Sequence, residues 1–142
     1  MPGQLFLVAY DGEDGGVVSY AADHAKTMGA SLHVLHVLEW SPYSFLTPEE
    51  LAERHKRRTE ELARANDIVM APILKSLNGT GVEVSSDIRY GNVVDLIIGT
   101  AKDKEADMIF VGRSGNSLAD RVFGSVPIGL AQAAPVATVI VP

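Results

Sequence analysis

Apolar residues along the chain fall into five short runs, and the segments between them repeat apolar positions at helical spacing. Four runs, QLFLVAY (4–10), SLHVLHVLE (31–39), ADMIFVG (106–112) and PVATVIV (135–141), are almost continuously apolar, whereas GVEVSSDIR (81–89) alternates. Continuous runs are typical of strands covered on both faces, as in parallel sheets, and alternation is typical of a half-exposed strand. The pattern therefore predicts five strands, with 81–89 at an edge of the sheet.

Four helices fit between these runs. They are expected at residues 16–28, 48–78, 92–104 and roughly 118–133. Thr47 and Pro48 are start signals for the second and longest helix, because a threonine can cap the first turn and proline suits its first position. Pro72 lies inside that helix and is expected to bend or interrupt it, since proline has no backbone N–H to donate.

Strands that alternate with helices predict the α/β class. Each helix then crosses over from one parallel strand to the next, and the helices cover both faces of the sheet. The chain has 142 residues, which is an ordinary size for one domain with its own core. We therefore expect a single domain over residues 1–142, without internal repeats or linkers.

Composition and charge exclude several classes of protein. The formal net charge is −6, which argues against a nucleic-acid-binding protein because such proteins normally carry a basic face. The absence of cysteine excludes disulfides and thiolate metal sites. No apolar run approaches the ~20 residues of a membrane span, and the first residues lack the pattern of a signal peptide. These features favour a cytoplasmic protein without membrane segments.

The two glycine-rich junctions of the chain are expected at one place in the fold. YDGEDGG follows the first strand, and GRSGNSLADRVFGSVP (112–127) follows the fourth. Ligands of open α/β sheets bind at the carboxyl ends of strands, where the strand order reverses. If the first strand is central and lies between the second and the fourth, both junctions border that crevice.

The residues of these junctions suit an anionic ligand. Glycines at positions 112 and 115 would let backbone amides approach an anion closely. The segment 124–126 precedes helical sequence, so its amides and the hydroxyl of Ser125 would meet the positive end of a helix. Asp11 offers a carboxylate for ribose hydroxyls or a metal. Neither glycine pattern is a Walker A or a G-x-G-x-x-G motif, so spacing alone leaves anion binding and a plain flexible loop equally open.

Three segments together resemble the universal stress protein family, and the resemblance extends over essentially the whole chain. They are LVAYDG, LHVLHVLE and VGRSGNSLADRVFGSVPIGLAQAAPVATVIV. The resemblance implies a five-stranded, Rossmann-like sheet with strand order 3-2-1-4-5. The nucleotide-binding branch of this family carries Gly-x-x-Gly, nine residues, and then Gly-Ser/Thr. Here eight residues, Asn116 to Phe123, separate Gly115 from Gly124, so the loop is one residue shorter.

The resemblance also implies which residues contact a nucleotide. Asp11 and Val37 take the adenosine side; the phosphate side falls to Gly112, Gly115, Gly124 and Ser125, with Arg113 and Val126 adjacent to them. Glu13 and Asp14 add negative charge near a triphosphate, which favours a divalent cation between them, such as Mg²⁺ held mainly by the phosphates.

These implications lead to a cytoplasmic universal stress protein that binds ATP, or AMP or ADP, as a regulatory ligand. Hydrolysis is expected to be slow at most, because no general base or attacking nucleophile is evident. The last strand, 135–141, is an apolar edge strand, and both this edge and the resemblance favour a homodimer through it. The alternatives are a nucleotide-free dimerising interaction module and an enzyme of adenine-nucleotide chemistry, which would need a catalytic His or Lys near the loop.

Other polar residues are expected to have structural roles. His33 and His36 lie three positions apart on a strand, so they face opposite sides and do not share a metal ion. They are interpreted as ordinary histidines of a sheet, and His24, alone on a helix, receives no role. The basic segment RHKRR (54–58) is interpreted as a solvated helix face answered by nearby glutamates rather than as a nucleic-acid patch.

Overall fold

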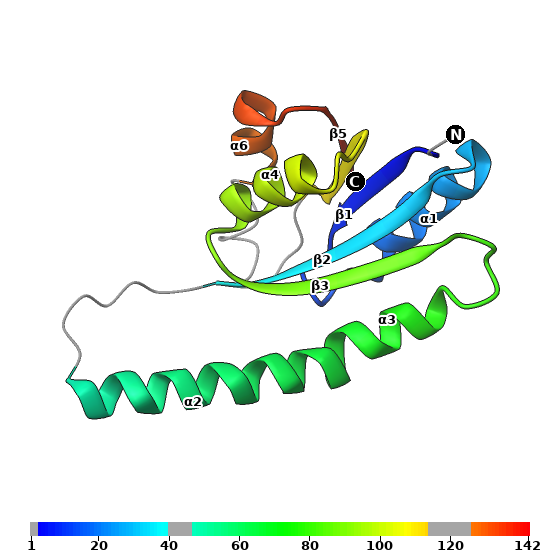
Figure 1. Cartoon of the computed structure of the whole chain (residues 1–142). Coiled ribbons are helices and arrows are strands. Elements are labelled where there is room, and N and C mark those ends of the chain that lie inside the picture. Colours follow the sequence, from blue (N-terminus) through cyan, green and yellow to red (C-terminus); the bar gives the residue numbers. More distant parts are fainter. Residues whose placement is uncertain (1–2, 40–46, 114–125) are drawn as a thin grey trace.

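The computed structural model describes residues 3–39, 47–113 and 126–142, which form a parallel five-stranded sheet with helices on both sides (Figure 1). The strands are β1 (Leu5–Ala9), β2 (Ser31–Glu39), β3 (Val84–Gly91), β4 (Met108–Gly112) and β5 (Ala137–Val141). The helical segments are α1 (Gly15–Met28), α2 (Pro48–Ala65), η1 (Asn66–Met70), α3 (Ala71–Ser76), α4 (Val93–Asp103) and α6 (Val126–Ala133). The strand order is β3-β2-β1-β4-β5, so the expected α/β class and strand order are both confirmed.

The five strands lie where the apolar runs predict them, with the largest shift at β3. This strand starts at Val84 rather than at residue 81. Gly79 and Gly81 adopt φ angles of 79° and 82°, a left-handed backbone that belongs to a turn and not to a strand. β3 pairs with β2 alone among the described strands, which confirms that it lies at an edge.

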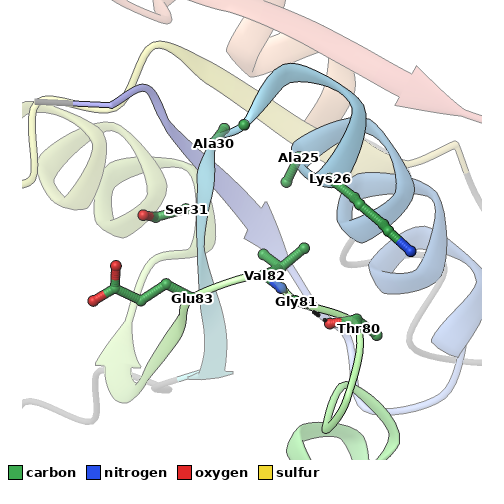
Figure 2. A pocket seen from close by; sticks show the side chains of 9 residues that line it. Ala25, Lys26, Ala30, Ser31, Thr80, Gly81, Val82 and Glu83 are labelled. Atoms are coloured by element: carbon green, nitrogen blue, oxygen red, sulfur yellow. Dashed lines mark hydrogen bonds between the residues drawn. The ribbon is translucent and has the colours of Figure 1, made fainter. Parts of the chain in front are cut away.

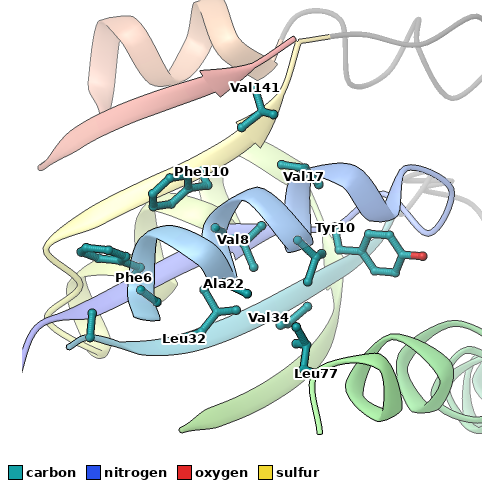
Figure 3. Close-up of a cluster of buried hydrophobic side chains, with 14 of the residues drawn as sticks. Phe6, Val8, Tyr10, Val17, Ala22, Leu32, Val34, Leu77, Phe110 and Val141 are labelled. Carbon is teal, nitrogen blue, oxygen red and sulfur yellow. The ribbon is translucent and has the colours of Figure 1, made fainter. Parts of the chain in front are cut away.

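One face of the sheet carries the first of two hydrophobic clusters (Figure 3). Side chains of β1 alternate between the faces, so Phe6 and Val8 point to this face and Leu7 to the other. Here α1 and the end of the α2–η1–α3 segment cover the sheet. The buried members are Phe6, Val8, Tyr10, Val17, Val18, Ala21, Ala22, Ala25, Ala30, Leu32, Val34, Met70, Leu77, Phe110 and Val141.

The opposite face carries the second cluster, under α4 and α6. Its members come from the alternate positions of β1, β2 and β4, from the inner sides of the two helices, and from the turn before β4. They are Leu7, Ala9, Leu35, Val37, Val93, Ile97, Ala101, Ala106, Ile109, Val111, Val126 and Leu130. Because both faces are packed, the central strands need apolar residues at consecutive positions, which is why their sequences read as continuous runs.

Helix α1 begins and ends where local signals place it. The carboxylate of Asp14 accepts a hydrogen bond from the backbone N–H of Gly16 at 2.9 Å, which satisfies a free donor of the first turn. Gly29 follows the last turn with a left-handed φ of 68°, and its N–H donates to the carbonyl of Lys26. The helix expected at residues 16–28 is thus confirmed, one residue longer at its start.

The long helix expected at residues 48–78 is interrupted, as expected from the presence of Pro72. Thr47 caps its start by accepting a hydrogen bond from the N–H of Glu50 at 3.2 Å. The interruption is a π-helical turn, η1, in which the N–H of Ala71 donates to the carbonyl of Asn66, five residues earlier. This turn ends at Met70, two residues before Pro72, which has no N–H to continue the helical hydrogen-bond ladder.

The basic segment 54–58 is only partly a solvated face. On its exposed side, Arg57 pairs with Glu53 at 3.9 Å between Nη2 and Oε1. On its inner side, the guanidinium of Arg58 lies over the ring of Tyr90 at 5.2 Å from the centroid, and the Tyr90 hydroxyl donates to Glu61. The segment therefore helps to attach α2 to β3. Among the described helices, including this long one, none is both long and apolar enough to cross a membrane.

Replacing Thr100 by valine is expected to stabilise the protein. Thr100 lies on the inner side of α4 with no exposed surface, and its Oγ1 has no hydrogen-bond partner in the described part of the chain. Thr100→Val keeps the shape and removes the uncompensated hydroxyl, so we expect a gain of about 1 kcal/mol in the free energy of unfolding. Urea unfolding measures it. Thr59→Val, at an exposed position where Oγ1 bonds the carbonyl of His55, should give no gain. A loss of stability in Thr100→Val would contradict the expectation.

Candidate functional site

The strand order creates a crevice at the carboxyl ends of β1 and β4. β1 pairs with β2 on one side and with β4 on the other, so the order reverses next to β1. Val8 lies opposite Phe110 on β4 and Ala9 opposite Leu35 on β2. Continuing both registers brings Asp11 level with Arg113 on one side and with Val37 on the other. The two junctions singled out in the sequence therefore leave the sheet side by side.

Asp11 organises the turn that follows β1. Its Oδ1 accepts hydrogen bonds from the backbone N–H groups of Glu13 and Asp14, at 2.8 and 2.9 Å. Asp14 in turn caps α1. The side chains of Asp11 and Asp14 therefore hold the turn between β1 and α1 through successive hydrogen bonds to backbone N–H groups. The half-buried Asp11 is thus already in use within the chain, and a ligand at this edge would meet a carboxylate whose orientation is set beforehand.

Gly112 and Arg113 form the end of β4. A Cβ atom added to Gly112 would meet no other atom within 4 Å in the part of the chain described here, and Gly112 is not among the glycines with positive φ. Among the residues that the structure describes, no contact therefore requires glycine at this position, whereas a ligand that approaches the backbone would need one. The N–H of Arg113 donates to the carbonyl of Val141 at 2.8 Å, and its side chain is exposed.

Val37 and Val126 both belong to the second cluster. Val37 is 6% exposed and packs near the end of β2, and Val126, 2% exposed, is the first residue of α6. Of the eight residues that the sequence assigned to a nucleotide site, the structure places Asp11, Val37, Gly112 and Arg113 at the carboxyl end of the sheet and Val126 in the second cluster. Gly115, Gly124 and Ser125 lie outside the described residues, and all eight roles stay predictions.

Two residues next to Asp11 were missed by sequence reasoning, His36 and Gly12. The His36 Nδ1 lies 2.7 Å from the carbonyl oxygen of Tyr10, and Gly12 adopts a φ of 93° directly beside the imidazole. His33 faces the other side and contacts the hydroxyl of Ser85 at 2.7 Å, which confirms that the two histidines point apart. Within the described ranges, no three His, Asp or Glu side chains gather in a way that could hold a metal ion.

A pocket of about 310 Å³ lies at the opposite, amino end of the sheet, between the end of α1 and the turn before β3. Figure 2 shows the side chains of Lys26 and Glu83 pointing away from each other, one from α1 and one from the turn. Binding sites normally bring several polar groups to bear on one ligand. This pocket lacks that convergence among its labelled side chains, so the carboxyl edge remains the candidate site.

Comparisons with known proteins agree with the fold. A model of the universal stress protein family matches residues 4–142, and a search of curated protein sequences finds no significant match. The structure resembles universal stress protein UspA from Lactobacillus plantarum, with a TM-score of 0.81, 24% identity and coverage of 100% of this chain and 99% of that one.

Two further similar structures are described as nucleotide complexes. A universal stress protein in complex with cAMP gives a TM-score of 0.60 at 24% identity, covering 100% of this chain and 98% of that one. The universal stress protein from Archaeoglobus fulgidus in complex with dAMP gives 0.66 at 18% identity, covering 100% of both chains. Such low identities establish a shared fold, whereas the family model spans nearly every residue. The chain therefore belongs to the universal stress protein family.

Proposed function

We propose that this universal stress protein binds an adenine nucleotide, ATP or a related one, as a regulatory ligand in the crevice between β1 and β4. The observation that carries the proposal is Gly112, a glycine at the carboxyl end of β4 that no contact with the described residues requires. Asp11 and Val37 lie beside Gly112, at matching positions of neighbouring strands. The polar side chain of Asp11 suits a ribose, and the apolar side chain of Val37 suits a base. The relatives described as complexes with cAMP and dAMP support an adenine nucleotide as the class of ligand.

The charges around the crevice favour a nucleotide that carries its own cation. Glu13 and Asp14 are both exposed near the turn and would repel a bare triphosphate. A Mg²⁺ ion held mainly by the phosphates would reduce that repulsion. We expect hydrolysis to be slow at most, because the imidazole beside this turn, that of His36, is buried and its Nδ1 is bonded to the carbonyl of Tyr10.

The proposal includes a homodimer through residues 135–141, in the cytoplasm. β5 lies at the edge of the sheet, pairs with β4, and leaves Ile140 45% exposed. An open strand edge with an exposed apolar side chain favours pairing with a second copy. The same edge supports the alternative function, a dimerising interaction module that binds no nucleotide.

Calorimetry of the nucleotide-stripped protein with ATP and Mg²⁺ tests the proposal. The parent chain should bind, and Asp11→Ala, Gly112→Val and Gly115→Val should each weaken binding by about tenfold or more, which corresponds to about 1.4 kcal/mol. Gly112→Val should leave the fold intact because a Cβ there meets no atom of the described residues within 4 Å. Sedimentation of the same samples reports the subunit number.

Matched controls come from α1 and α4. Asp23→Ala removes an exposed carboxylate from the second half of α1, and Gly99→Val adds a side chain at a position in α4 with equally open space. Both should bind like the parent chain. Failure of the parent chain to bind would overturn the proposal in favour of the interaction module. Steady phosphate release at about 1 s⁻¹ or faster would instead support an enzyme.

A further inference from the structure

The end of β1 is held by a side chain of the neighbouring strand. The N–H of Tyr10 donates to the carbonyl of Leu35 at 2.9 Å, which continues the backbone pairing of β1 with β2. The carbonyl of Tyr10 is met by the Nδ1 of His36 at 2.7 Å. His36 is only 6% exposed, so this hydrogen bond is largely shielded from water and from the competition that water would bring.

The contact fixes which nitrogen of the His36 imidazole carries a proton. A carbonyl oxygen only accepts hydrogen bonds, so the Nδ1 of His36 must carry the proton that it donates. In the neutral ring the Nε2 is then an acceptor. Its position, 3.8 Å from a Cβ added to Gly12, directs that side of the ring toward the turn after β1.

Gly12 fits into a narrow space between two elements. A Cβ atom at this position would lie 3.2 Å from the Cε1 of His36 and 3.5 Å from the Cγ1 of Val69, on the π-helical turn η1. The φ of 93° also disfavours any residue with a side chain. The backbone of the turn is thus enclosed by β2 on one side and by η1 on the other, directly next to Asp11.

From these contacts we propose that His36 is a positioning residue, which fixes the turn that carries Asp11 and thereby the nucleotide affinity of the crevice. The second part of this statement rests on the proposed function. The first part does not, because the hydrogen bonds from Glu13 and Asp14 to Asp11 exist without any ligand. Loss of the His36 donor leaves the Tyr10 carbonyl buried without its partner and loosens the turn that begins there.

Three variants of His36 separate the effect of the position of the hydrogen-bond donor from the effect of side-chain size. His36→Leu removes the donor and keeps an apolar side chain of similar reach. His36→Asn places an amide N–H where Nδ1 stands, and His36→Gln places it one bond further out. Hydrogen exchange of the Glu13 and Asp14 amides in nucleotide-free protein should accelerate about five- to tenfold in the Leu and Gln variants. The Asn variant should exchange at the rate of the parent chain.

The matched control is the other buried histidine of β2. His33→Leu removes a histidine that is also buried, but on the opposite face, where it contacts Ser85 rather than the turn. It should leave exchange of Glu13 and Asp14 unchanged relative to the core amide of Ile109. Calorimetry with Mg²⁺ and ATP on the same samples should show affinity falling about fivefold or more in His36→Leu and recovering in His36→Asn.

Each outcome decides one of the two statements. Unchanged exchange at Glu13 and Asp14 in His36→Leu, or an equal acceleration at Ile109, would overturn the positioning role. Faster local exchange in a protein whose parent chain binds no ATP would support the role and overturn the proposed function instead. If His36→Leu does not fold, His36→Gln gives the same test, because it moves the donor one bond further out and keeps a polar side chain.

Discussion

Replacing Phe110 by alanine is expected to cost about 3–5 kcal/mol of the free energy of unfolding. Phe110 lies in the middle of β4 with no exposed surface. Its ring centroid is 5.5 Å from that of Phe6, 5.7 Å from His24 and 6.1 Å from Tyr20, all in tilted arrangements. Truncation would remove these ring contacts and leave a cavity under α1, in a domain whose total stability is about 5–15 kcal/mol.

Urea unfolding measures this loss as a shift of the midpoint at an unchanged m value. Phe110→Leu, which refills part of the space, should lose less than half as much. Tyr20→Ala tests the exposed end of the same aromatic group, since Tyr20 is 42% exposed and stacks on His24 at 5.5 Å. A loss in Tyr20→Ala as large as that in Phe110→Ala would show that the buried ring is not the centre of this packing.

Acidification below pH 6.5 is expected to destabilise the protein through His33. Burial lowers the pKa of His33 from its ordinary value of 6.5, and the nearby charges of Lys104 and Arg89 lower it further, whereas Asp87 raises it. The Nε2 of His33 has no partner in the described part of the chain, so a proton added there would be buried and unpaired. The unfolded chain has no such restriction and takes up the proton more readily.

The sign of the effect follows from proton binding. Above pH 6.5 both states leave His33 neutral, so its contribution is constant. Between 6.5 and the lowered pKa of the folded state, the unfolded chain binds more protons, and stability falls as the pH falls, by at most about 1.4 kcal/mol per pH unit. Below that pKa the loss becomes constant. Urea unfolding of the parent chain and of His33→Leu between pH 7.5 and about 5 measures it; equal slopes in the two proteins would contradict the role of His33.

Much of the fold could be predicted because its signals are local. The continuous apolar runs of β1 and β4 reflect packing on both faces, and the caps at Thr47 and Gly29 satisfy backbone groups within a few residues. The start of β3 was misplaced because glycines at 79 and 81 form a turn, which the alternating pattern does not reveal. The start of the break in the long helix, at Asn66, lies ahead of Pro72 because the π-helical turn precedes the proline.

The candidate site was predicted only in part. Asp11 and Gly112 stood out as ends of apolar runs, and the order of strands that places them together came from the resemblance. His36 was interpreted as an ordinary histidine of the sheet. Its contacts with Tyr10 and Gly12 depend on how β2 pairs with β1, which the residues around His36 do not reveal. The nucleotide roles of all eight assigned residues remain predictions, and Gly115, Gly124 and Ser125 lie outside the described residues.

The sequence by itself determined the α/β class, the family and the elements, because periodicity, capping and turn residues act over a few neighbouring positions. Tertiary structure decided what each polar residue does. Two histidines three positions apart on β2 have the same local sequence signal, yet one lies beside Ser85 and the other supports the turn of Asp11. The difference arises from the neighbours that each face of the sheet brings to them, and those neighbours come from distant parts of the chain.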